Sequence, residues 1–126
     1  MCLYTTKPAK IAEKPIIVYK ILLLKNIILS IYCTPCQGNL VMINDTLKAS
    51  VDTEPWSNTS LCIIEGEGVH AYTSIEKAKR SLYDFDAITK WEIPAGAKYW
   101  EGTGITEGEI AATEMKFIEV CEFNIS

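Results

Sequence analysis

The chain has 126 residues and a formal net charge of −4, which comes from 16 acidic and 12 basic residues mixed along its length. Because 48% of the residues are hydrophobic, the chain can bury a core of its own, and it is expected to fold as one domain over residues 1–126 without a metal or a disulfide. No basic stripe is present that would neutralise phosphates, so the composition argues against a nucleic-acid partner.

The N-terminal part is expected to be an arm followed by a hairpin. Residues 1–14 lack periodicity and predict an extended arm. The apolar runs "IIVYKILLL" (16–24) and "IILSIYC" (27–33) are joined by a short Lys-Asn link, which predicts a β-hairpin. Lys20 and Lys25 interrupt the apolar sequence, so no run approaches the ~20 residues that cross a bilayer, and no membrane partner is expected.

The rest of the chain is predicted to consist of strands around one helix. A second hairpin is expected around Asn44-Asp45, between residues 39–43 and 46–51, and a loop over residues 52–60. Later strands are expected in "LCIIE" (61–65), "GEGVHAY" (66–72), "AITKWEI" (87–93), "AKYWE" (97–101) and "MKFIEVCEF" (115–123). The predicted fold class is α+β: a single domain with an antiparallel, strongly curved sheet and one main helix.

That helix is predicted in "YTSIEKAKRSLYDF", over residues 73–84. Thr73 stands three residues before Glu76, which is the spacing of a capping box at a helix N-terminus. Ile75, Ala78 and Leu82 follow at helical spacing and predict one apolar stripe that packs on the sheet.

The motif Cys33-Thr34-Pro35-Cys36 has three possible interpretations: a redox pair, half of a zinc site, or a turn that holds two thiols. A redox pair needs a helix after it to lower a thiol pKa, and a strand-like run follows Cys36 instead. A structural zinc site needs a second ligand pair, and the chain has a single histidine. The five cysteines of the chain are an odd number, which predicts reduced thiols in a cytoplasmic protein. The motif is therefore predicted to be a turn with unmetallated thiols, and no metal site is expected.

The single histidine, His70, precedes the predicted helix. Alternation along "GVHAYTS" places His70 and Tyr72 on one face of a strand, with Val69 and Ala71 on the other. If Val69 and Ala71 face the core, His70 is predicted to be a surface residue beside solvent or a groove.

Two motifs in the C-terminal half occur in a suggestive order. The triplet Tyr72-Thr73-Ser74 precedes the predicted helix, and Glu107-Gly108-Glu109 precedes the last strand. This order resembles the arginine-targeting ADP-ribosyltransferases, in which a Ser-Thr-Ser strand precedes a helix and a Glu-x-Glu turn precedes a late strand. The resemblance implies that Thr73 and Ser74 support an NAD site and that Glu109 is the catalytic carboxylate.

Two positions depart from that pattern. Tyr72 stands where the family has the first serine of its triplet, and it joins the implied NAD-binding residues at that position. Lys20, in "VYKIL", stands where the first strand of the family has an arginine that grips the NAD phosphates. A lysine is a compact charge without the bidentate fork of an arginine.

A second resemblance covers most of the chain. The stretches "MCLYT", "GVHAYTSIEKAK" and "IPAGAKYWEG" are similar to those of a group of small uncharacterised bacterial and phage-associated proteins. The members of that group usually lack a Glu-x-Glu turn, which implies that Glu107 and Glu109 are incidental.

The sequence thus predicts a non-enzymatic cytoplasmic module that binds a protein or a small-molecule ligand and holds no cofactor. The alternative is an active or degenerate ADP-ribosyltransferase-like enzyme that uses NAD. The two predictions differ at Glu109, which should lie in a cleft with Lys20 and Tyr72 in the enzyme and on an exposed loop in the binding module.

Overall fold

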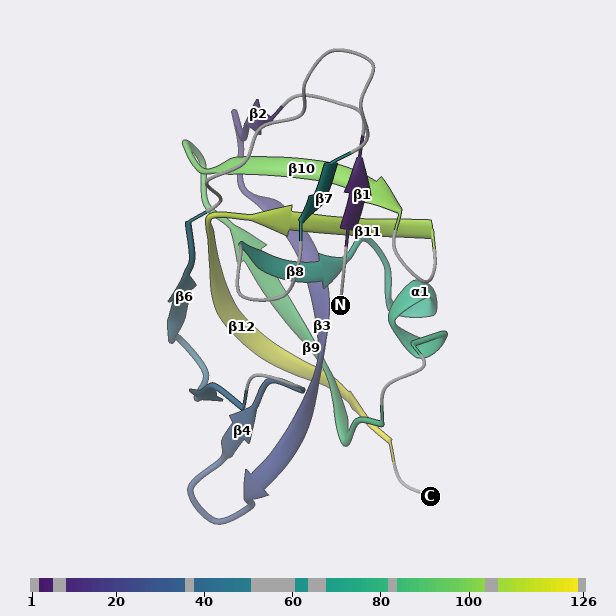
Figure 1. The fold of residues 1–126 in the computed structure, drawn as a ribbon. Coiled ribbons are helices and arrows are strands. Elements are labelled where there is room, and N and C mark those ends of the chain that lie inside the picture. The colour runs from purple at the N-terminus through teal and green to yellow at the C-terminus, as the bar shows by residue number, and fades with distance from the viewer. Residues whose placement is uncertain are drawn as a thin grey trace.

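The computed structural model describes residues 3–5, 9–35, 38–50, 61–63, 68–81, 84–103 and 107–124. Within them the chain forms a single domain of mostly antiparallel sheet, with 58% strand and one short helix (Figure 1). This confirms the antiparallel, single-domain part of the prediction, and the helical share is smaller than predicted.

The described strands number twelve, and their bounds are β1 Leu3–Thr5, β2 Lys10–Ile11, β3 Ile16–Asn26, β4 Ile31–Cys33, β5 Leu40–Val41, β6 Thr46–Lys48, β7 Leu61–Ile63, β8 Val69–Tyr72, β9 Ala87–Ile93, β10 Lys98–Thr103, β11 Glu107–Ala112 and β12 Glu114–Phe123. The helix is α1, Ile75–Lys79. Neighbouring strands follow the order β6-β12-β9-β3-β8-β11-β10-β1-β7 in one open sheet, with β2 beside β10, β4 beside β3 and β5 beside β4. In Figure 1, β8, β11 and β10 lie across the upper part, whereas β3, β9 and β12 run steeply down and bend along their length.

The main core forms on one face of the long strands. β3 and β9 pair in register from Ile16↔Ile93 to Leu22↔Ala87, so alternate residues of both strands meet on the same face. Trp91 of β9 and Phe117 of β12 are fully buried there and stack with their ring centroids 4.9 Å apart. A smaller cluster, which includes Tyr72 and Ala78, lies under α1.

The helix begins two residues later than predicted, at Ile75, and is shorter. The Oγ of Ser74, not that of Thr73, accepts the hydrogen bond from the Lys77 backbone amide at 3.2 Å. Helix α1 ends at Lys79, because the amides of Arg80 and Ser81 bond three residues back and tighten the last turn. The predicted capping box and the span 73–84 are therefore wrong, while Leu82 lies outside the described residues. No helix in the described part of the chain is long and apolar enough to cross a membrane.

The first predicted hairpin forms, although its turn is not at the predicted Lys25-Asn26 link, and the second predicted hairpin is wrong. β3 pairs with β4 through Leu23↔Cys33 and Leu24↔Tyr32, and the turn between them covers residues 27–30. β5 and β6 do not pair with each other: β5 pairs with β4, and β6 pairs with β12. The left-handed backbone of Asn44, with φ 78°, forms the predicted turn, but backbone bonds from this turn to Phe117 direct the following strand to β12.

Three strands lie where none was predicted. β1 and β2 fall within the N-terminal segment 1–14 and pair with β10, so this segment contributes two strands to the sheet. β11 contains the whole Glu107-Gly108-Glu109 motif and lies between β8 and β10.

Candidate functional site

The triplet and the Glu-x-Glu motif lie on adjacent strands. Tyr72 of β8 is the direct cross-strand partner of Glu109 of β11, so their side chains project from the same face of the sheet. The backbone amide of Thr73 donates to the Gly108 carbonyl at 2.9 Å, which continues the ladder to the end of β8. The two motifs therefore meet in space.

Glu109 is buried rather than exposed. It lies in a strand, and 1% of its surface is accessible, against 3% for Tyr72. The expectation of an exposed loop at Glu109 is therefore wrong, because the glycine- and glutamate-rich sequence is held as a strand by β8 on one side and β10 on the other. A carboxylate with 1% exposure is not open to a substrate in this conformation.

Lys20 lies on the opposite face from Tyr72 and Glu109. Tyr19 is the cross-strand partner of Tyr72, and successive residues of a strand point to opposite faces. The Lys20 ammonium donates to the His70 carbonyl and stands 5.8 Å from the ring centroid of Trp91, in the main core. The sheet thus separates Lys20 from Tyr72 and Glu109.

His70 is buried, with 7% exposure, so the prediction of a surface histidine is wrong. The reason is the position of β8, which is an inner strand between β3 and β11 and has all four of its residues buried. Val69 and Ala71 belong to the main core and Tyr72 to the cluster under α1, so both faces of β8 are covered. Alternation in the sequence identifies the two faces but cannot show that both are buried.

Thr73 and Ser74 have structural contacts. Ser74 caps α1, and the Oγ1 of Thr73 is 3.3 Å from the Nζ of Lys77, which donates to it. The side chain of Lys77 also occupies the space over Gly108, where the φ of +79° favours glycine. These contacts join the triplet, the helix and the Glu-x-Glu strand.

The predicted turn after β4 can be followed only in part. Cys33 is a free, buried thiol at the end of β4, and Cys36 lies outside the described residues. The amides of Gly38 and Asn39 bond back to Thr34, and Gly38 has the left-handed φ of 68°. Among the described residues no three His, Cys, Asp or Glu side chains gather as metal ligands would.

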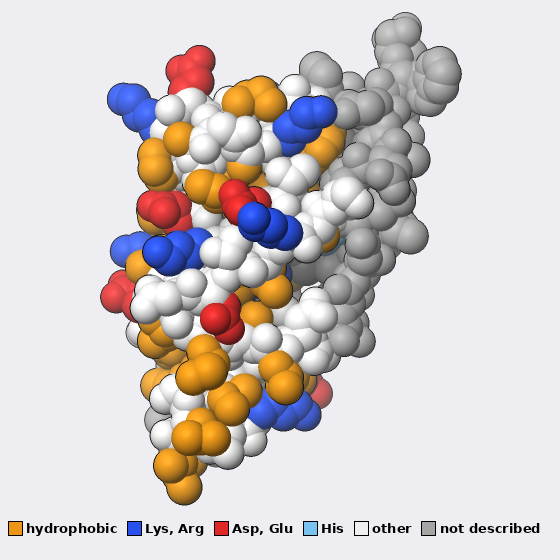
Figure 2. Space-filling model, turned by 90° about the vertical axis from the view of Figure 1, so that its left-hand side faces the viewer, with side chains coloured by type: hydrophobic (Ala, Val, Ile, Leu, Met, Phe, Trp, Pro, Cys, Tyr) orange, Lys and Arg blue, Asp and Glu red, His pale blue; other side chains and the backbone are white. Residues whose placement is uncertain are grey.

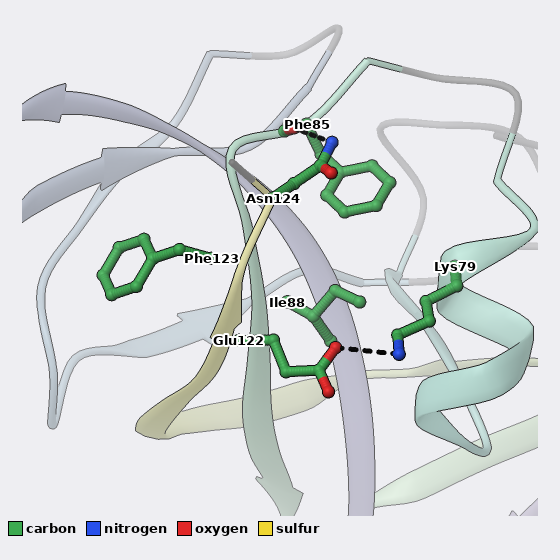
Figure 3. A pocket seen from close by; sticks show the side chains of 6 residues that line it. All are labelled: Lys79, Phe85, Ile88, Glu122, Phe123 and Asn124. Carbon is green, nitrogen blue, oxygen red and sulfur yellow. Dashed lines mark hydrogen bonds and ion pairs between the residues drawn. The ribbon is translucent and has the colours of Figure 1, made fainter. Parts of the chain in front are cut away.

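A pocket of about 340 Å³ lies between α1 and the end of β12 (Figure 3), lined by Lys79, Phe85, Ile88, Glu122, Phe123 and Asn124. Its charged groups pair with each other, because Lys79 Nζ lies 3.0 Å from a Glu122 carboxylate oxygen. The Asn124 amide donates to the Phe85 carbonyl at 3.1 Å. A ligand here would have to displace these contacts, so the pocket does not define a ligand class.

The most unusual surface is at the free end of the β3–β4 hairpin. Six large hydrophobic residues at this turn and along the adjoining strand β5, which we call the apolar end, have exposures between 43% and 88%: Ile27, Ile28, Leu29, Leu40, Met42 and Ile43. Ile27, Ile28 and Leu29 form the turn, and the other three lie in or just after β5, which pairs with β4. Figure 2, which views the molecule from the left-hand side of Figure 1, shows hydrophobic side chains gathered at the lower end, where Figure 1 places the β3–β4 turn.

This surface was not predicted from the sequence, because the apolar run 27–33 has the composition of a strand. Asn26 is a signal for the turn, because its Oδ1 accepts a hydrogen bond from the backbone amide of Leu29 at 2.9 Å. Three large apolar residues in a row after that asparagine would then fall in a turn, where exposure is the rule.

Comparison with known proteins yields no match: no family model, no curated protein and no solved structure resembles this chain at a significant level.

Proposed function

We propose that the protein is a cytoplasmic binding module, not an enzyme, and that it associates with another protein through the apolar end. The observation that carries the proposal is the exposure of Ile27 and Ile28, at 77% and 88%. Single exposed apolar residues are common on protein surfaces, whereas a contiguous group of them marks an interaction site. The free thiols of Cys33 and Cys121 support a reducing compartment.

The hairpin that presents the apolar end is fixed to the rest of the sheet. Its base is held by the Leu24 amide, which donates to the Asp86 carboxylate at 2.7 Å, and by the burial of Tyr32 against Phe117. A rigid support of this kind lowers the entropy that a partner must remove on binding. The exposed turn is therefore suited to recognition.

Site-specific photo-crosslinking tests the proposal. A photoreactive residue at position 28 should crosslink a defined partner in cells, and the same residue at position 11 should not. Ile11 is the matched control because it is also an exposed isoleucine, at 54%, and lies in β2 at the other end of the domain (Figure 1). Equal crosslinking from both positions, or none from position 28, would contradict a binding role for the apolar end.

An ADP-ribosyltransferase-like activity is a second candidate, favoured by the direct pairing of Tyr72 with Glu109. The burial of Glu109 and the position of Lys20 on the other face weigh against it. Incubation with NAD tests this candidate, with nicotinamide release measured for the wild type and for Glu109→Gln. We expect no release from either protein; release from the wild type that disappears in Glu109→Gln would instead establish the enzyme.

A further inference from the structure

We propose that the partner of the apolar end is a second copy of this chain, and that two copies form a closed, two-fold symmetric dimer through this surface. The inference rests on the proposed function and specifies its partner. It is supported by the charge of the surface, by its area and by the strand at its border.

The charge of the segment favours self-association over other occupants. Residues 25–45 contain one basic residue, Lys25, and one acidic residue, Asp45, whereas the whole chain has a net charge of −4. In a two-fold symmetric contact each surface meets its own copy, so any net charge on it would be repelled. This segment has none, while an anionic lipid surface would meet a single lysine and an overall negative protein.

The area of the apolar end is of the size that a dimer uses. Burial of one Ile or Leu side chain removes on the order of 100 Å² of apolar area, so six largely exposed residues amount to several hundred Å². A standard interface buries about 800 Å² on each partner, including the polar atoms around such a centre. The largest apolar patch on a typical monomer is roughly 300–600 Å² and often functional, and the apolar end falls within that range.

The strand at the border of the surface can also take part. Among the described strands β5 pairs with β4 alone, and the side chain of Leu40 in β5 is exposed. Two copies of one edge strand that meet across a two-fold axis run antiparallel, which is the arrangement found throughout this sheet. A dimer would cover this edge and the neighbouring apolar side chains together.

The test is the mass of the full chain in solution, measured by light scattering after size exclusion and by sedimentation over a wide concentration range. The variants are Ile28→Lys and Leu40→Lys in the apolar end, with Ile11→Lys as the matched control. All three positions are more than half exposed, so each variant should fold, which circular dichroism checks. We expect the wild type and Ile11→Lys to have twice the 14.1 kDa of one chain and both apolar-end variants to have a single chain's mass.

Other outcomes overturn the dimer and separate its failure from that of the proposed function. A wild type that stays monomeric at every concentration excludes the dimer; if position 28 still crosslinks a different protein in cells, the binding role stands with another partner. If the wild type is a monomer that floats with phosphatidylcholine vesicles, and Ile28→Lys no longer does so, the apolar end binds a membrane surface and not a second copy. A dimer that survives both apolar-end variants places the contact elsewhere and overturns the dimer proposal, whereas the binding role of the apolar end is then decided by crosslinking from position 28.

Discussion

Ser74 shows how a single hydroxyl decides where the helix starts. Its backbone is extended, with φ −148° and ψ 160°, and its Oγ accepts from the Lys77 amide, which are the two properties of an N-cap residue. Thr73 is one position too early for that bond and is exposed. In the sequence both residues are good caps, and the spacing to Glu76 favours the wrong one.

Replacing Ser74 by alanine should lower the free energy of unfolding by about 1 kcal/mol, because the first turn of α1 loses its only side-chain acceptor among the described residues. The matched control is Thr73→Ala, which removes an exposed contact with the Lys77 ammonium and should change stability by a few tenths of a kcal/mol. Urea unfolding of the two variants provides the measurement. A larger loss from Thr73→Ala would show that the cap is assigned to the wrong residue.

Cys121 is a half-buried thiol of β12 with a shifted ionisation. Burial is the main cause that raises the pKa of Cys121, and the neighbouring Glu119 carboxylate raises it further. Because the folded pKa is above the unfolded one, the neutral thiol contributes stability that is fully present below the unfolded pKa. That contribution is lost as the pH rises through the folded pKa.

Alkylation by iodoacetamide should therefore be slower at Cys121 in the folded protein than in the urea-unfolded chain at pH 8, because only the thiolate reacts. Glu119→Gln removes one of the causes and should speed the reaction in the folded state. Peptide mass spectrometry gives the rate at this one cysteine. If Cys121 in the folded protein were alkylated as fast as in urea, the raised pKa would be contradicted.

The elements that the sequence predicts best are those whose residues favour them locally. "AITKWEI" contains the β-branched residues Ile88, Thr89 and Ile93, and β9 has the predicted bounds Ala87–Ile93. "EGEIAA" in β11 has poor strand propensity and forms a strand through its pairing with β8 and β10, which no local signal shows. For the same reason the sequence could not show that Tyr72 and Glu109 are neighbours, because their contact depends on the pairing of β8 with β11.

The packing of β9 against β3 depends on a buried polar contact. The Thr89 hydroxyl donates to the Lys20 carbonyl at 2.8 Å and accepts from the Trp91 indole N–H at 2.8 Å. Thr89 and Trp91 both have 0% exposure, so water cannot replace either bond. This hydroxyl therefore connects the backbone of β3 with the largest side chain of the core.

Thr89→Val should destabilise the fold by about 1 to 3 kcal/mol, because it leaves the buried Trp91 N–H without its acceptor while the shape of the side chain is kept. Thr89→Ser keeps the hydroxyl and should cost less, mainly through one lost methyl group. Thermal or urea unfolding compares the two variants. A larger loss from Thr89→Ser than from Thr89→Val would mean that the methyl, not the hydroxyl, carries the contribution of Thr89.

At the scale of the whole molecule, the sheet separates charge from apolar surface. Among the described residues, the charged pairs Lys48–Glu114, Lys79–Glu122 and Lys90–Glu119 lie along β12, and Lys10–Glu101 joins β2 to β10. The β3–β4–β5 extension carries the apolar end and almost no charge. Two chains that meet through this end are therefore repelled by each other's net charge at a distance, whereas the contact itself brings few charges together.

That separation predicts how salt should act on the dimer. The chain has a formal net charge of −4 at pH 7 and stays negative at pH 8, so two chains repel each other. Salt at 0.1 M screens this repulsion beyond about 10 Å. Added salt should therefore lower the dimer dissociation constant severalfold at pH 8, and the effect should shrink near pH 5.0, the isoelectric point of the sequence. Ion pairs across the interface would respond in the opposite way, because salt weakens them. Sedimentation of the wild type at low and high salt distinguishes the two, and a dimer that salt dissociates at pH 8 would show that charge, not the apolar end, holds the copies together.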